Sequence, residues 1–180
     1  KYDKFNYFNQ AFFNDSINIE IKDNLIINQP IIIKTTDIKD SLISNIFIKI
    51  GKDSQAEIIF INNNSDNKES LYFSQNIFLS ALDNSKLNLI NLTNLNSETL
   101  SINNKNLESS QNSLIYLYDV FSGSNFTRSH VYSNLNGKDS KVFHKSFTIS
   151  NNQSQFDLLN SIDHFSENSF SNISTKAVLF

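Results

Sequence analysis

The stretch that decides the fold is DNSKLNLINL, residues 83–92. It opens with the polar triplet Asp83-Asn84-Ser85 and continues with Leu87 and Leu89, which alternate with polar neighbours. Asn and Asp can bond to their own backbone and can adopt the left-handed conformation in place of glycine. Alternation with a period of two is typical of a half-buried strand. The stretch therefore predicts a turn followed by a strand.

The same kind of unit recurs along the chain. Similar triplets precede strand-like segments at residues 14–16, 52–54, 111–113, 138–140 and 167–169. The six serines that end the triplets are separated by 38, 31, 28, 27 and 29 residues. A unit of this length is too short to bury its own core, and repetition of such units is the pattern of a solenoid. We predict an all-β fold, a parallel β-helix with coils of about 27–31 residues. The alternative is a β-sandwich whose turn signals are evenly spaced.

Two segments differ from this pattern. In residues 56–61, AEIIFI, apolar side chains fill both faces of the predicted strand, which suggests that something covers its outer face. Residues 1–13, KYDKFNYFNQAFF, read as a helix because Phe5, Phe8 and Phe12 have near-helical spacing.

Length and composition limit the class of protein. The chain has 180 residues, of which 39% are apolar, so one domain with a real core is expected over residues 1–180. It contains no methionine, and we interpret it as a segment of a longer chain that lacks its N- and C-terminal flanks. The net charge of −3 argues against a nucleic-acid partner. No apolar run is long enough to cross a membrane, and the absence of cysteine fits a reducing compartment.

The three histidines are the first candidates for chemistry. His130, His144 and His164 are spaced by 14 and 20 residues, which matches no compact metal motif. In coils of this length they are not expected to stack, so a three-histidine site is not predicted. His164 lies in the last coil and could join ligands from another chain. The alternative is that His164 is an ordinary hydrogen-bonded or solvent-facing residue.

Other polar residues give little support for catalysis. Asp163 is adjacent to His164 in a predicted strand, so the two side chains should point to opposite faces and make a poor acid–base pair. No serine lies in a Gly-x-Ser-x-Gly turn, and the 18 acidic residues do not recur in pairs at the coil period. We interpret Arg128 as a surface or turn-bracing residue.

Two stretches carry a resemblance to a known family. In residues 8–34 an Asn-x-Ala-Phe segment, an Asp-Gly turn and a Pro-Ile pair have the counterparts Asn9-Gln10-Ala11-Phe12, Asp15-Ser16 and Pro30-Ile31. Residues 121–180 are similar to the last core coils of the same family. The matching residues there are Arg128, Gly137, Gln153, Asp157, His164, Ser171 and Lys176. On these motifs the chain resembles the core domain of the SufD family, subunits of the Suf iron–sulfur cluster assembly system.

The resemblance implies a right-handed β-helix that serves as a non-catalytic scaffold in the cytoplasm. Its implied partners are a SufB-like paralogue and a SufC-like ATPase, the latter bound through a C-terminal region outside this segment. It implies His164 as a metal ligand in a site shared at the subunit interface. No cofactor would be held stably by this chain alone, although a transient iron–sulfur cluster would form at the interface.

Some positions depart from the family pattern, and a second function stays open. Glu167 and Ala177 replace a usual proline and a usual glycine. The SufB paralogue shares the Asp–His–Lys pattern, so the SufD assignment depends on Pro30-Ile31 and on residues 128–137. The alternative function is a secreted β-helical carbohydrate-active or adhesin domain.

Overall fold

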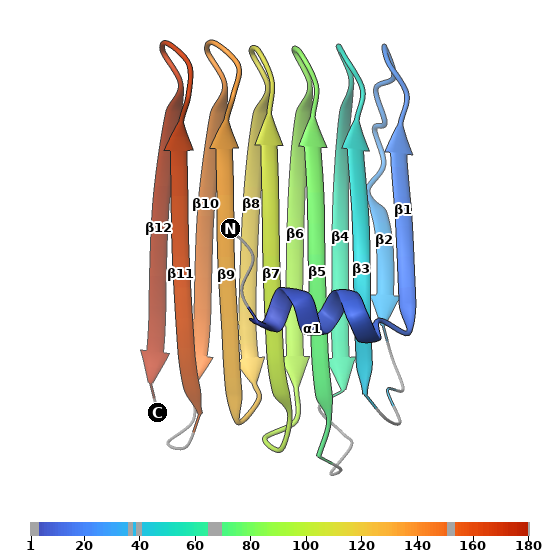
Figure 1. The fold of residues 1–180 in the computed structure, drawn as a ribbon, viewed down its shortest axis with the longest axis vertical. Coiled ribbons are helices and arrows are strands. Elements are labelled where there is room, and N and C mark those ends of the chain that lie inside the picture. Colours follow the sequence, from blue (N-terminus) through green and yellow to red (C-terminus); the bar gives the residue numbers. More distant parts are fainter. Residues whose placement is uncertain (1–3, 36–37, 39–40, 65–69, 151–153, 180) are drawn as a thin grey trace.

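The computed structural model describes residues 4–35, 38, 41–64, 70–150 and 154–179, and Figure 1 shows their arrangement. Within these ranges the chain forms one short helix followed by twelve strands. The elements are α1 (Lys4–Phe12), β1 (Asp15–Ile21), β2 (Ile31–Thr35), β3 (Leu42–Ile50), β4 (Gln55–Asn64), β5 (Tyr72–Ala81), β6 (Lys86–Leu95), β7 (Leu100–Ser109), β8 (Leu114–Gly123), β9 (Phe126–Leu135), β10 (Lys141–Ser150), β11 (Gln155–His164) and β12 (Phe170–Leu179).

The strands form two parallel sheets that face each other. Sheet A has the order β1-β3-β5-β7-β9-β11, and sheet B has the order β12-β10-β8-β6-β4-β2. Each coil thus gives one strand to each sheet. In Figure 1 the strands of sheet A run upward in front and those of sheet B run downward behind, while the chain advances from right to left. This path is right-handed, and the predicted parallel β-helix is confirmed.

Five of the six predicted triplets form turns from sheet A to sheet B, as expected. The middle residue of each has a left-handed backbone, with φ between 55° and 60°, at Asp53, Asn84, Asn112, Asp139 and Asn168. The serine that follows caps its own turn in several coils. For example, Ser113 Oγ donates to the carbonyl oxygen of Ser110 at 2.8 Å.

The prediction for the first triplet, residues 14–16, is wrong. Asp15 and Ser16 lie inside β1, and the first left-handed turn residue is Asn24, with φ of 59°. Asn24 precedes Asp53 by 29 residues, so the first coil has a regular length in place of the 38-residue spacing between Ser16 and Ser54. The turn was missed because Leu25 occupies the serine position. The backbone N–H of Leu25 instead donates to Ser54 Oγ of the next coil at 3.1 Å.

Strict register stacks equivalent residues into columns that run along the solenoid axis. One interior column of sheet A passes through Ile21, Ile50, Ala81, Ser109, Leu135 and His164. Most aliphatic interior residues belong to one buried cluster that spans both sheets. Because parallel stacking repeats every coil, the interior of one coil is covered only by its neighbours.

The outer faces of the two sheets differ. α1 crosses the outer face of sheet A and packs on β3 and β5, which confirms the predicted helix over Lys4–Phe12 (Figure 1). No described element crosses the outer face of sheet B. Ile59 and Ile61 of β4 point outward there and are half-buried. The cover expected for residues 56–61 is therefore not found among the residues that the structure describes.

Candidate functional site

His164 is the last residue of β11 and continues an interior column. Its register partner on β9 is Leu135, which is fully buried in the core cluster. His164 itself is exposed, because no described coil stacks on β11. The imidazole thus stands at an interior position on the C-terminal end of the solenoid.

Two serines hold the imidazole ring. His164 Nδ1 lies 2.7 Å from Ser169 Oγ, and Nε2 lies 3.0 Å from Ser171 Oγ. Ser169 uses its only hydroxyl proton toward the carbonyl oxygen of Ser166, at 2.9 Å. Its oxygen therefore accepts a hydrogen bond from Nδ1–H of His164, and in the matching tautomer the lone pair of Nε2 faces Ser171. In this tautomer Nε2 is the nitrogen that can bind a metal, and Nδ1 is oriented by a neighbour.

Asp163 does not assist His164. It pairs in register with Asn134, an outward-facing residue, so its carboxylate and the imidazole project from opposite faces of β11. This arrangement confirms the prediction that the two residues make a poor acid–base pair.

The C-terminal end of the solenoid exposes positions that are covered in the other coils. Ile173 on β12 stacks above the buried His144 and is 43% exposed. Ala177 stacks above the buried Thr148 and is also exposed. β11 and β12 are moreover the outermost strands of their sheets, so each presents one unpaired backbone edge. No residue that the structure describes covers these positions.

The three histidines lie in different places, as predicted. His130 projects from the outer face of sheet A, His144 lies inside the solenoid on sheet B, and His164 lies at its end. Among the described residues no three His, Cys, Asp or Glu side chains gather into a metal-binding group. A metal at His164 would need its other ligands from elsewhere.

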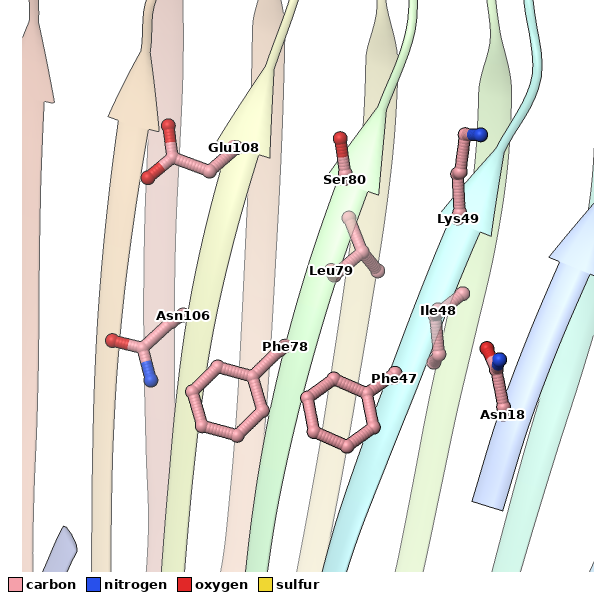
Figure 2. Close-up of a pocket in the computed structure, with 9 residues that line it drawn as sticks. All are labelled: Asn18, Phe47, Ile48, Lys49, Phe78, Leu79, Ser80, Asn106 and Glu108. Atoms are coloured by element: carbon pink, nitrogen blue, oxygen red, sulfur yellow. The ribbon is translucent and has the colours of Figure 1, made fainter. Parts of the chain in front are cut away.

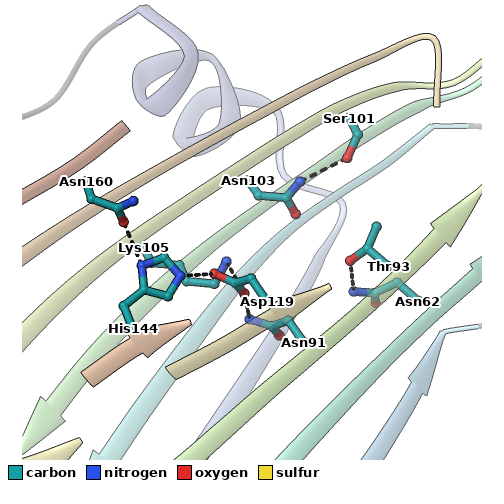
Figure 3. A network of polar contacts seen from close by, with 9 residues as sticks. All are labelled: Asn62, Asn91, Thr93, Ser101, Asn103, Lys105, Asp119, His144 and Asn160. Atoms are coloured by element: carbon teal, nitrogen blue, oxygen red, sulfur yellow. Dashed lines mark hydrogen bonds and ion pairs between the residues drawn. The ribbon is translucent and has the colours of Figure 1, made fainter. Parts of the chain in front are cut away.

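The interior contains an ionic cluster that the sequence patterns did not reveal (Figure 3). Lys105 Nζ lies 3.1 Å from Asp119 Oδ1, and both side chains are almost fully buried. His144 Nε2 donates to Asp119 Oδ2 at 2.9 Å, and the amide of Asn91 donates to Asp119 Oδ1 at 3.0 Å. On its other side the His144 ring contacts Asn160 Oδ1 at 2.6 Å. One sequence feature could have indicated this contact, because Asn91 and Asp119 are 28 residues, or one coil, apart.

The cluster controls the ionisation of Asp119. Burial alone would raise the pKa of this carboxyl, but the Lys105 ammonium and the hydrogen bonds from His144 and Asn91 outweigh it. The pKa of Asp119 is therefore held far below its usual range. The Lys105 ammonium and the Asp119 carboxylate are paired with each other and shielded from solvent, which favours a structural role over a catalytic one.

The interpretation of Arg128 as a surface or turn-bracing residue is wrong. Arg128 is 4% exposed and lies on the outer face of sheet A beneath α1. Its guanidinium stacks on the Phe5 ring at 4.8 Å and donates to Asn104 Oδ1 at 2.8 Å. Nη2 lies 2.7 Å from His130 Nδ1, and Nε lies 3.5 Å from Asp157 Oδ2. Arg128 thus joins the helix to the sheet, a tertiary contact that no local pattern reveals.

The remaining family-type positions do not gather around His164, apart from one. Ser171 contacts its ring, whereas Asp157 lies on the outer face of sheet A and Lys176 on the outer face of sheet B. Gly137 serves packing, because a Cβ there would overlap the backbone of the preceding coil at Ser110 and Gln111. Gln153 lies outside the described residues.

A shallow groove of about 470 Å³ lies on the outer face of sheet A (Figure 2). Its floor includes Phe47 and Phe78, whose rings stack at 5.2 Å with an angle of 14° between their planes. None of the site residues predicted from the sequence lines it. The lining residues are Asn18, Phe47, Ile48, Lys49, Phe78, Leu79, Ser80, Asn106 and Glu108.

These features define a parallel β-solenoid with a structural ionic interior and a histidine in its last described coil. A comparison with protein families matches residues 32–180 to the SUF system FeS cluster assembly, SufBD core domain. The match covers most of the chain, which therefore belongs to the SufBD core domain family. No curated protein and no solved structure matches the chain. The described residues contain no helix with the length and apolarity to span a bilayer.

Proposed function

We propose that this chain is a SufD-type, non-catalytic scaffold subunit of a cytoplasmic Suf complex. In this complex it pairs with a SufB-like paralogue, and a SufC-like ATPase supplies any ATP hydrolysis. Family membership supports the general role in iron–sulfur cluster assembly. The SufD assignment is supported by Pro30-Ile31 at the start of β2 and by the segment from Arg128 to Gly137.

The position of His164 is the observation that carries the proposal. The imidazole, oriented by Ser169, lies at an inward position of the last described strand of sheet A, and no described strand stacks on it. A paralogous solenoid that docks on the C-terminal end would bury Ile173 and Ala177 and would meet the edges of β11 and β12. His164 would then lie inside the interface.

A site shared with a partner subunit fits the ligands that this sequence offers. The chain contains no cysteine, and one histidine cannot hold an iron–sulfur cluster. In the proposal the cluster is the cargo of the complex, His164 offers Nε2 as one ligand, and the partner offers the others. Metal binding at Nε2 would replace the contact with Ser171 Oγ and would leave the contact with Ser169 intact.

The test is reconstitution of the full-length chain with its SufB-like and SufC-like partners. His164→Ala should lower the iron–sulfur content of the complex several-fold without changing its size in gel filtration. His164→Cys should restore part of the content, because a thiolate is a competent cluster ligand. The matched control is Asp163→Ala, which changes the adjacent exposed residue on the opposite face.

Two results would contradict the proposal. A wild-type chain that stays monomeric beside its partners would refute the scaffold role. Wild-type cluster content in the His164→Ala complex would refute the ligand role and would leave the scaffold role in place.

A further inference from the structure

The outer face of sheet B carries an apolar surface that crosses consecutive coils. On β4, β6 and β8 two neighbouring columns consist of Ile59, Ile90 and Tyr118, and of Ile61, Leu92 and Val120. We call these six residues the sheet B belt. Alternate residues of a strand face opposite sides of the sheet, and the neighbours of these six residues, such as Ile58, Leu89 and Leu117, are fully buried inside the solenoid. The six side chains therefore point outward. A row of outward apolar side chains that crosses consecutive strands is a candidate interaction surface.

The belt continues into a hollow toward the C-terminal coils. The hollow has a volume of about 350 Å³, and its lining includes Tyr118, Val120 and Phe147 together with Lys145 and Lys176. Beside it, the rings of Tyr116 and Phe143 stack at 5.0 Å with an angle of 17° between their planes. Aromatic walls and two ammonium groups therefore surround one depression on an otherwise flat sheet.

The charge on this face is strongly one-sided. Five lysines and one glutamate point outward from the described strands of sheet B. The glutamate is Glu57, and it accepts a hydrogen bond from Asn88. The lysines are Lys34, Lys86, Lys141, Lys145 and Lys176. They take part in no ion pair with the described part of the chain. The excess does not follow from the overall composition, because the chain as a whole has a net charge of −3.

The other face of the same solenoid shows how such a surface can be covered. On sheet A, α1 lies across the strands rather than along them (Figure 1). It buries outward-facing residues of β3 and β5, including Asn45 and Ser74. The backbone groups of the inner strands of sheet B are already used within the sheet. A ligand on the belt must therefore bind through side chains, as an amphipathic helix does.

We propose that the outer face of sheet B docks an acidic amphipathic helix of a partner protein. The apolar side of the helix packs along the belt, and its carboxylates pair with the lysines that continue the belt columns, Lys145 and Lys176 at the hollow and Lys34 at the opposite end. A helix of about 18 residues is about 27 Å long, which matches six strands spaced by about 4.8 Å. This surface is separate from the end of the solenoid that carries His164.

The experiment uses the full-length chain and two synthetic peptides of about 18 residues, a length that matches the sheet. One peptide forms a helix with a leucine face flanked by glutamates, and the other carries lysines in place of the glutamates. Binding is followed by fluorescence anisotropy. We expect the acidic peptide to bind at least about tenfold more tightly than the basic one, and the difference to shrink with added salt.

Charge-reversal variants locate the binding surface. The triple variant Lys141→Glu, Lys145→Glu, Lys176→Glu should lose or invert the preference. The matched control reverses three exposed lysines on the turns, Lys22, Lys52 and Lys138, and should bind like the wild type. Circular dichroism of all variants establishes that the solenoid remains folded.

Several outcomes would overturn the proposal. Equal binding of the two peptides, or binding of neither, would refute charge-selective docking of a helix. Binding of vesicles that contain phosphatidylserine, without binding of the acidic peptide, would identify the face as a membrane surface. Self-association that disappears only in the sheet B variant would identify the occupant as a second copy of the chain. Binding that survives the sheet B variant would place the site elsewhere.

Discussion

Asn84 shows how a solenoid with few glycines makes its turns. Its φ of 57° lies in the left-handed region, which costs an ordinary side chain about 1–2 kcal/mol. The amide side chain offsets part of this cost through a ladder between coils. Asn84 Nδ2 donates to Asp53 Oδ1 at 2.9 Å, and Asn112 Nδ2 donates to Asn84 Oδ1 at 3.1 Å. The turn residue therefore also connects neighbouring coils.

Substitutions at Asn84 separate the two contributions. Asn84→Gly loses the ladder but keeps an unstrained backbone, whereas Asn84→Ala loses the ladder and adds left-handed strain. We expect Asn84→Ala to lower the free energy of unfolding by about 1 kcal/mol more than Asn84→Gly does. Urea denaturation of both variants measures the difference. A glycine variant that is the less stable of the two would show that the backbone strain at this position is negligible.

The buried charge of Lys105 allows a second prediction at this scale. Lys105→Met leaves the carboxylate of Asp119 without its ammonium partner in the core, and removal of one member of a buried pair typically costs about 3–5 kcal/mol. We expect a loss of this size in urea denaturation at neutral pH. The double variant Lys105→Met, Asp119→Asn should recover much of it, because the amide oxygen introduced at position 119 would still accept the hydrogen bond from His144.

The pH dependence of this loss has a defined sign. In the wild type the pKa of Asp119 is lowered by folding, so its stabilising contribution is present at neutral pH and is lost only in strong acid. Without Lys105, burial would raise the pKa of Asp119 in the folded variant. The free energy of unfolding of the variant would then be lowered at pH values at which the carboxyl is ionised in the unfolded chain. The difference between the two proteins should therefore shrink below about pH 4. A difference that is constant with pH would contradict the ionic account.

At the scale of elements, α1 is held by polar contacts and by the stack of Phe5 on Arg128. Asn6 and Asn9 are fully buried, whereas Phe8 and Phe12 are 44% and 61% exposed. Asn9 Nδ2 donates to Ser74 Oγ of β5 at 3.0 Å. The periodic phenylalanines predicted a helix correctly, but the face that they suggested is not the buried one. Outward-facing polar residues of the sheet, Asn45 and Ser74, are buried in this region, and Asn9 binds to Ser74.

Removal of Arg128 should release this helix without unfolding the solenoid. Arg128→Ala deletes the stack on Phe5 and leaves the Asn104 carbonyl without its donor. We expect amide hydrogen exchange in residues 4–12 to rise about tenfold or more, equivalent to a loss of about 1.4 kcal/mol or more. Exchange in β6 and β8 should stay unchanged. The control is Lys49→Ala, which removes the exposed pair with Glu20 and should leave α1 protected.

At the scale of the whole molecule, the repeat made most of the fold predictable. The turn triplets with left-handed Asn or Asp define the coil length, and the coil length requires stacking. The predictions that failed concerned residues whose surroundings are set by tertiary contacts. The first turn was missed because Leu25 occupies the serine position, and the hydroxyl group that contacts this turn belongs to Ser54 of the next coil. Arg128 was misjudged because the residues that cover it, such as Phe5, are far away in the sequence. His164 was selected by its family resemblance and by its coil, and its contacts with Ser169 and Ser171 required coordinates.

The buried ionic cluster also bears on how the chain avoids mistakes while it folds. Aliphatic columns are nearly alike from coil to coil, so they discriminate weakly against a chain that skips one coil and pairs with the next. Lys105 on β7, Asp119 on β8 and His144 on β10 are complementary only in the native order. A skipped coil would bury one of these groups against aliphatic side chains, at a cost of several kcal/mol. We therefore expect the cluster to disfavour folding intermediates in which a coil is skipped.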